Sequence, residues 1–201
     1  MGKKSDMRLA DYEVLLCLTG GIACYKSADL ASKLVQAGAG VTAAMTDSAT
    51  RFITPLTLQS LTHRQVFTSV WQSSETFETQ HISLVELADL MIVAPATANI
   101  IAKMANGIAD DLVSVLALSA AGECPVLVAP AMNTRMWNAP PTRDNVGRLR
   151  KWGIRIVGPG EGYLACGTIG AGRMAEPAEI IETAKTILSR KPPKRRSASS
   201  R

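Results

Sequence analysis

The stretch YEVLLCLTGGI, residues 12–22, decides the fold of this chain. Its first seven residues form a nearly continuous apolar run, which is typical of a strand buried on both faces of a parallel sheet. The pair Gly20–Gly21 follows, and a helical pattern then runs from about Ala23 to Ala37 and stops at Gly38. A buried strand, a glycine turn and a helix in this order predict the first unit of an α/β fold.

The same alternation continues to the end of the chain. Buried strands are predicted over 12–18, 41–46, 87–96, 124–131 and 154–159, and helices over 23–37, 48–61, 98–106, 110–121, 143–152 and 177–188. Thr97 can cap the helix over 98–106, and Gly107 can end it. We therefore expect a single-domain α/β protein: a Rossmann-like (flavodoxin-like) parallel sheet with helices on both faces.

Charge is distributed unevenly along the 201 residues. The formal net charge is +5, but residues 190–201 hold six basic residues and no acid, so residues 1–189 carry a net charge of −1. We expect a flexible N-terminus over 1–11, one folded domain over 12–189 and a disordered basic tail over 190–201.

Composition argues against several classes of protein. Hydrophobic residues make up 47%, enough for a substantial core, while the 4% of aromatic residues disfavour a nucleic-acid reader built on base stacking. There is no apolar stretch of membrane-spanning length and no signal peptide, so we expect a cytoplasmic protein without membrane or nucleic-acid partners. The scattered Cys17, Cys24, Cys124 and Cys166 are interpreted as reduced thiols, and two histidines are too few for a metal site built on several of them.

Ligands of parallel α/β sheets bind at the carboxyl ends of the strands. The loops expected at that edge are 19–22, 46–52, 95–99, 130–137 and 158–173. Gly20 and Gly21 let backbone N–H groups approach an anion or a flat ligand, although a simple tight turn explains them equally well, and the dinucleotide fingerprint GxGxxG is absent. Thr97 and Asn99 can hydrogen-bond a planar ligand, and Thr97 can do so while capping its helix.

The loop over 130–137 combines an amide with apolar side chains. Asn133 comes just after a buried strand, where a fixed side-chain amide can bind a carboxylate or a carbonyl group. Met132, Met136 and Trp137 are expected to form apolar walls beside it.

The segment over 158–173 is rich in glycine, which predicts a mobile lid that a ligand orders. Cys166 lies in its middle, with little core to fill, so we expect its thiol to act on the bound ligand. A lone histidine is more often structural than catalytic; His63 is interpreted as structural, and His81 comes just before the third strand.

With these residues in view, the chain resembles the flavin-dependent cysteine decarboxylases over roughly residues 12–188. The likeness rests on five ordered motifs: TGGIACYK (19–26), HISL (81–84), PATANIIAKMANGIADDL (95–112), PAMNTRMW (130–137) and GYLACGTIGAGRMAEP (162–177). The PxMNxxMW and ACGxxGxGRMAE patterns are the most specific of them.

The resemblance implies FMN as the cofactor, held by Gly20, Gly21, Ile22, Thr46, Phe52, Thr97, Ala98, Asn99 and Ile100. By the same likeness His81 is the active-site base, Asn133 holds the substrate carboxylate and Cys166 is the proton donor. Substrate contacts are expected from Met132, Asn133, Met136, Ala165 and Arg173, with Arg173 as a candidate for binding a phosphate.

The family's chemistry explains why these residue types are needed. Direct loss of CO₂ from an acylated cysteine leaves an unstabilised carbanion, so an electron sink is required. A hydride leaves the cysteine Cβ while His81 takes the thiol proton; the thioaldehyde then loses CO₂ to give an enethiolate. The hydride returns and Cys166 supplies the final proton, so the reaction is redox-neutral and needs no NAD(P)H.

The resemblance also implies a substrate and partners. The expected reaction converts 4'-phosphopantothenoylcysteine to 4'-phosphopantetheine in coenzyme A biosynthesis, in a homotrimer or dodecamer. The related bacterial protein usually continues into a synthetase domain, so we expect either a separate phosphopantothenate–cysteine ligase or a longer chain. The alternatives are a decarboxylase of peptides that end in cysteine, a flavin prenyltransferase and a flavin-binding regulator. His81, Asn133 and Cys166 together, with the PxMNxxMW motif, argue against the last two.

Overall fold

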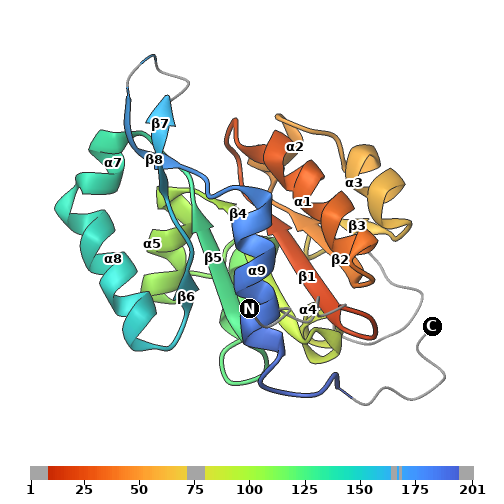
Figure 1. Ribbon diagram of the computed structural model, residues 1–201. Helices are drawn as coiled ribbons and strands as arrows, with labels where there is room; N and C mark the ends of the chain where they lie inside the picture. Colours follow the sequence, from red (N-terminus) through yellow and green to blue (C-terminus); the bar gives the residue numbers. More distant parts are fainter. Residues whose placement is uncertain (1–8, 72–79, 164–166, 168, 195–201) are drawn as a thin grey trace, which may run out of the picture.

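The computed structural model describes residues 9–71, 80–163, 167 and 169–194. Within them the chain forms a parallel sheet in the order β3-β2-β1-β4-β5-β6 and a separate antiparallel hairpin, β7-β8 (Figure 1). The strands of the sheet are β1 (Glu13–Leu18), β2 (Gly40–Met45), β3 (Val66–Phe67), β4 (Leu90–Ala96), β5 (Val126–Pro130) and β6 (Arg155–Ile156), and the hairpin is β7 (Gly160–Tyr163) with β8 (Ile169–Arg173). The predicted fold class is confirmed.

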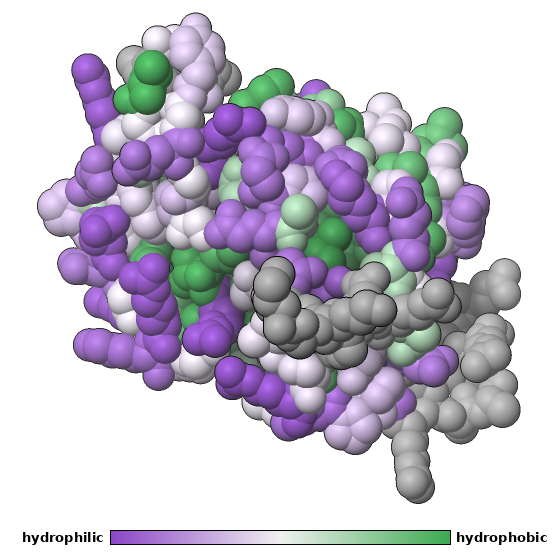
Figure 2. Space-filling model, in the orientation of Figure 1, coloured by the Kyte–Doolittle hydropathy of each residue, from purple (hydrophilic) through white to green (hydrophobic). Residues whose placement is uncertain are grey.

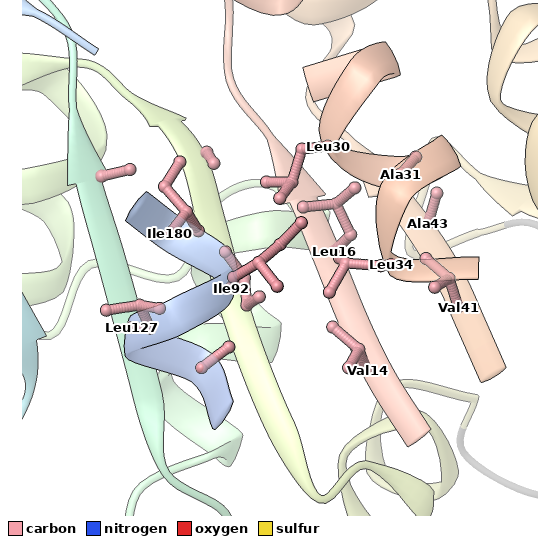
Figure 3. Close-up of a cluster of buried hydrophobic side chains, with 14 of the residues drawn as sticks. Val14, Leu16, Leu30, Ala31, Leu34, Val41, Ala43, Ile92, Leu127 and Ile180 are labelled. Atoms are coloured by element: carbon pink, nitrogen blue, oxygen red, sulfur yellow. The ribbon is translucent and has the colours of Figure 1, made fainter. Parts of the chain in front are cut away.

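Helices cover both faces of the sheet. They are α1 (Cys24–Gln36), α2 (Asp47–Thr50), α3 (Pro55–Thr62), α4 (Gln80–Leu87), α5 (Ala98–Asn106), α6 (Leu112–Ser119), α7 (Thr134–Asn138), α8 (Pro140–Lys151) and α9 (Pro177–Leu188). The side chains of β1 alternate between two cores: Leu16 belongs to a core that includes residues of α1, α3 and α9, and Leu15 belongs to one that includes residues of α4, α5, α6 and α8. Figure 3 shows the first core, with Leu30 from α1 and Ile180 from α9 meeting the strand residue Ile92.

Local chemistry sets the helix ends that lie near the site. The Thr97 hydroxyl accepts a hydrogen bond from the Ile100 N–H at 3.4 Å, and Gly107 ends α5 in the left-handed conformation with φ +68°. Both ends agree with the sequence-based expectation. Asp111 and Ser114 form a capping box at the start of α6.

The structure differs from the expected elements where proline or long-range pairing intervenes. The helix expected over 48–61 is two helices, because Pro55 forces Thr54 out of the helical conformation, to ψ 150°. Pro140 likewise starts α8 earlier than the expected residue 143. The strand β3 and the helices α4 and α7 were not expected, and the strand expected over 154–159 is reduced to Arg155–Ile156.

The two ends of the described chain pack on the sheet. Leu9 is fully buried, and its N–H donates to the Ala37 carbonyl at 2.8 Å. At the other end the Lys194 N–H donates to Asp89 Oδ1 at 2.8 Å, and the Tyr12 hydroxyl donates to the Lys191 carbonyl at 3.0 Å. No helix in the described part of the chain is long and apolar enough to cross a membrane.

Candidate functional site at the carboxyl edge of the sheet

The strand order places a topological switch point between β1 and β4, and we call the carboxyl edge of the sheet at this point the crevice. The chain leaves β1 through α1 toward β2 and leaves β4 through α5 toward β5, so the two connections diverge from adjacent strand ends. Such a switch point is where open parallel sheets bind ligands. The loop over 19–22 and the loop that begins at Thr97 form the two sides of this crevice.

A buried hydroxyl ties these two loops together. Thr19 is 2% exposed; its Oγ1 donates to the Pro95 carbonyl at 2.7 Å and accepts from the Thr97 N–H at 3.1 Å. Nearby, the Ser27 hydroxyl on α1 donates to the Ala94 carbonyl at 2.8 Å. The geometry of the crevice is therefore fixed by hydrogen bonds between β1, α1 and β4.

The two glycines of the first loop serve different purposes. A Cβ on Gly20 would lie 2.4 Å from the Cβ of Ser48, so Gly20 is required for the loop to pack against α2. A Cβ on Gly21 would meet only the Thr97 methyl, at 3.8 Å, so Gly21 leaves open space toward the crevice. The sequence could not separate these roles, because Ser48 belongs to another element.

Apolar side chains are exposed beside this crevice. Ile22 is 63% exposed and Phe52 is 49% exposed, and Tyr25 and Leu56 are also exposed on α1 and α3. Figure 2 shows apolar surface over α2 and α3 at the upper right of the molecule. Exposed large apolar groups at a polar strand edge indicate that something covers them, either a ligand or a protein partner.

The other predicted cofactor residues divide into exposed and buried groups. The Thr46 hydroxyl accepts from the Ala49 N–H at 3.2 Å as the N-cap of α2. Asn99 is exposed and Ala98 is half-buried at the start of α5. Ile100 is 1% exposed and belongs to the core, so its side chain does not face the crevice. Only the backbone atoms of Ile100 are therefore left to make the predicted contact with a cofactor.

Asn133 lies where the sequence placed it, between β5 and α7. Its Oδ1 accepts from the Arg135 N–H at 2.8 Å, which fixes the orientation of the amide as the N-cap of the short helix. Met136 is 49% exposed and Met132 is half-buried, as walls of a site require. Trp137 is instead 6% exposed and packs in the core under Arg143, so its predicted place in the wall is wrong.

The glycine-rich segment forms the β7-β8 hairpin, whose base rests on the Asn133 loop. The Met132 N–H donates to the Gly172 carbonyl at 2.9 Å. A Cβ on Gly172, at φ +144°, would lie 2.1 Å from the Met132 carbonyl oxygen, and one on Gly170 would lie 2.6 Å from Thr134 Oγ1. These glycines permit close backbone contact between hairpin and loop. The expected lid is thus anchored at its base (Figure 1).

Charged groups hold the end of the hairpin. Arg173, predicted to bind substrate phosphate, pairs with Glu176 at 3.0 Å and is 44% exposed. Glu176 also pairs at 2.8 Å with Lys26, whose side chain is 7% exposed. The Lys26 hydrogen bond is the main cause that lowers the pKa of the Glu176 carboxyl. Sequence reasoning missed Lys26 and Glu176, although both lie within the quoted motifs.

Some predicted residues fall outside what the structure describes. Ala165 and Cys166 lie outside the described residues, and His81 is placed only as the second residue of α4, without its side chain. Burial raises the pKa values of the Cys17, Cys24 and Cys124 thiols, so these three are poor proton donors or nucleophiles near neutral pH. A groove of about 1530 Å³ beside Glu13 and Arg64, at the opposite edge, contains none of the predicted site residues.

The residues at the crevice suit a flavin in their chemistry. Gly21 leaves space for a flat ring, Ile22 and Phe52 supply exposed apolar surface, and Thr97 and Asn99 supply polar groups. The first turns of α1 and α5 point their N–H groups to this edge, which favours an anionic phosphate. Fold and crevice together are those of an α/β protein suited to a flat, phosphate-bearing ligand at its switch point.

Comparison with known proteins agrees with this class. The profile of the family described as Flavoprotein matches residues 3–189. The Coenzyme A biosynthesis bifunctional protein CoaBC of Bacillus subtilis is 48% identical over 177 residues, which are 88% of this chain and 43% of that protein. The probable phosphopantothenoylcysteine decarboxylase of Streptococcus mutans is 41% identical over 170 residues, 85% of this chain and 95% of that one.

Solved structures give the same result. A mutant PPC decarboxylase complexed with pantothenoylaminoethenethiol superposes with a TM-score of 0.81 at 34% identity, over 87% of this chain and 97% of that one. The FMN binding protein AtHal3 has a TM-score of 0.81 at 33% identity, over 90% of this chain and 99% of that one. The chain belongs to the flavoprotein family, in the branch of the flavin-dependent cysteine decarboxylases. It spans less than half the length of the bifunctional relatives it matches.

Proposed function

We propose that this chain is an FMN-dependent decarboxylase that converts 4'-phosphopantothenoylcysteine to 4'-phosphopantetheine. The observation that carries the proposal is the seating of the β7-β8 hairpin on the Asn133 loop, beside a crevice suited to a flavin. Support for the substrate comes from the Streptococcus mutans relative, which this chain covers almost completely.

The residues of the chain divide the work. When bound, FMN would supply an electron sink for a hydride from the substrate Cβ. Gly20, Gly21 and Ile22 would line the flavin, and Thr97 and Asn99 would hydrogen-bond its ring region. Thr46 and Phe52 would lie near its ribityl-phosphate side. The carboxamide of Asn133, oriented by the Arg135 N–H, holds the substrate carboxylate next to the reacting carbon.

Proton transfer is assigned to two side chains. The His81 imidazole takes the substrate thiol proton as the thioaldehyde forms, because its ordinary pKa lies near neutrality. Once CO₂ has left, the Cys166 thiol donates a proton to the enethiolate carbon as the hydride returns. Both assignments rest on the positions of these residues in the HISL and ACGTIG motifs.

We also propose that the exposed apolar residues at the crevice lie in a subunit contact of a trimer or dodecamer. Ile22, Tyr25, Phe52 and Leu56 supply the apolar surface such a contact needs. A phosphopantothenate–cysteine ligase supplies the substrate in this proposal, and the cytoplasmic location stays a prediction. Light scattering on the purified protein tests the subunit contact; a monomer at micromolar concentration contradicts it.

The experiment that tests the function offers two substrates side by side. Purified FMN-loaded protein is incubated with phosphopantothenoylcysteine and, separately, with a peptide that ends in cysteine; mass spectrometry follows the loss of CO₂. We expect loss from the phosphopantothenoyl substrate alone. Loss from the peptide alone moves the protein to peptide modification, and bound flavin without loss from either contradicts the proposal.

A further inference from the structure

The base of the hairpin is joined to the crevice by a three-residue ion cluster. Glu176 Oε1 accepts a hydrogen bond from Lys26 Nζ at 2.8 Å and forms an ion pair with an Arg173 guanidinium nitrogen at 3.0 Å. Lys26 Nζ also donates to the Met174 carbonyl at 3.1 Å. One carboxylate oxygen therefore joins the first turns of α1 to the last residue of β8.

Burial shows that this cluster is built into the fold. The Lys26 side chain is 7% exposed, and Met174 is 2% exposed. A buried ammonium group keeps its charge only with close partners, and here they are Glu176 and a backbone carbonyl. Surface ion pairs such as Lys33 with Asp29, on the same helix, lack this confinement, because both side chains are nearly half exposed.

The cluster lies between the two parts of the site. α1 begins just after Gly20, Gly21 and Ile22, while β8 ends at Arg173 and leads back through the hairpin toward Cys166. Figure 1 shows the hairpin rising from the body where the chain enters α9. On the other side, β8 is held to the Asn133 loop by backbone contact at Gly172. The hairpin base is thus fixed at two points.

We propose that Glu176 is a positioning residue: through Lys26 and Arg173 it sets the hairpin that carries Cys166 relative to the flavin crevice. This role rests on the proposed function. In this role Glu176 affects the final protonation of the product. The first oxidation of the substrate depends on the crevice and His81 and not on Glu176. Arg173, held by Glu176, is then oriented along β7, where its side chain lies against Gly162.

The test compares Glu176→Ala with Glu179→Ala, an exposed carboxylate in the first turn of the same helix. FMN-loaded proteins are mixed with phosphopantothenoylcysteine without oxygen. The rate of flavin reduction and the ratio of oxidised enethiol to saturated product are measured. We expect Glu176→Ala to keep its FMN and reduce it at about the wild-type rate, while the final step slows roughly tenfold or more. Glu179→Ala should match wild type.

Two further variants address the partner. Lys26→Met removes the ammonium group, and Lys33→Met is its control on the same helix. In the double variant Lys26→Met/Glu176→Ala, the effects on product ratio should be strongly non-additive, because both changes break one interaction. If the Lys26→Met protein fails to fold, the Glu176→Ala variant still carries the test, because the Glu176 side chain is 57% exposed.

Each outcome decides the role. A Glu176→Ala enzyme with the product ratio of Glu179→Ala overturns it, and so does equal slowing of both half-reactions. If wild type decarboxylates no substrate, the proposed function fails, and the alkylation rate of Cys166, read by peptide mass spectrometry, decides instead. We expect severalfold faster alkylation in Glu176→Ala; rates equal to Glu179→Ala overturn the positioning role.

Discussion

Replacing Gly172 by alanine tests whether the hairpin rests on the Asn133 loop as described. The added Cβ would lie 2.1 Å from the Met132 carbonyl oxygen, closer than real Cβ atoms come to any neighbour. The backbone there has φ +144°, which an L-amino acid with a side chain rarely adopts. The hairpin therefore has to move away from the loop, and the hydrogen bond from the Met132 N–H at 2.9 Å is lost.

The size of the effect follows from these two costs. A non-glycine residue in such a conformation costs of order 1–3 kcal/mol, and a lost hydrogen bond adds about 1 kcal/mol. We expect the free energy of unfolding to fall by about 2–4 kcal/mol, each kcal/mol lowering Tm by roughly 2–4 °C for a chain of this size. If the hairpin moves away from the loop and its backbone is not strained, the free energy of unfolding falls less and substrate binding becomes weaker.

The assay is urea unfolding at fixed protein and FMN concentrations, because bound ligand adds to apparent stability. Gly160→Ala is the matched control on the same hairpin, since its Cβ would meet only the Arg173 carbonyl oxygen at an ordinary 3.8 Å. A Gly172→Ala protein as stable as Gly160→Ala, with unchanged KM, refutes the described docking of hairpin and loop.

Five more predictions follow, three from the described residues and two from the proposed proton transfers. Gly21→Ala, whose Cβ meets only a methyl group at 3.8 Å, should leave the stability of the apoprotein unchanged but weaken FMN binding in a fluorescence titration; unchanged affinity excludes flavin contact there. Gly147→Ala fills open space inside α8 and should raise the free energy of unfolding by about 0.5–1 kcal/mol, read from urea midpoints. Glu176 has a lowered pKa, so its stabilising contribution is present above its ordinary value of 4.5 and disappears as pH falls through the lowered pKa; Tm curves of wild type and Glu176→Gln should therefore converge at acid pH. Cys166→Ser should release the oxidised enethiol product with the flavin left reduced, and His81→Asn should block flavin reduction by substrate; saturated product from the first, or normal reduction in the second, removes the respective residue from its role.

Local sequence predicted the parts of the fold that depend on short-range chemistry. The apolar runs of β1, β4 and β5 could be read directly, because strands buried on both faces need no polar residues. The ends of α5 followed from Thr97 and Gly107. The edge strand β3 has only two residues, Val66 and Phe67, and no pattern of that length is distinctive.

The candidate site was predicted in its loops but not in its contacts. The glycine-rich sequence predicts freedom of movement, whereas Gly170 and Gly172 allow close approach to Thr134 and Met132, about 40 residues away in the sequence. Lys26 and Glu176 are 150 residues apart, and no local pattern shows that a lysine is buried. The loop position of its neighbours predicts Trp137 in the site, but the turn of α7 directs it into the core.

The most direct test of the central claim is CO₂ release without oxygen. FMN-loaded protein is given excess phosphopantothenoylcysteine in the absence of oxygen and of added nicotinamide, and CO₂ is counted per bound flavin. Because the proposed reaction returns its hydride to the product, it predicts many equivalents of CO₂ and an equal amount of saturated thiol. A single equivalent that leaves the flavin reduced shows an oxidative decarboxylase, and no CO₂ at all contradicts the account.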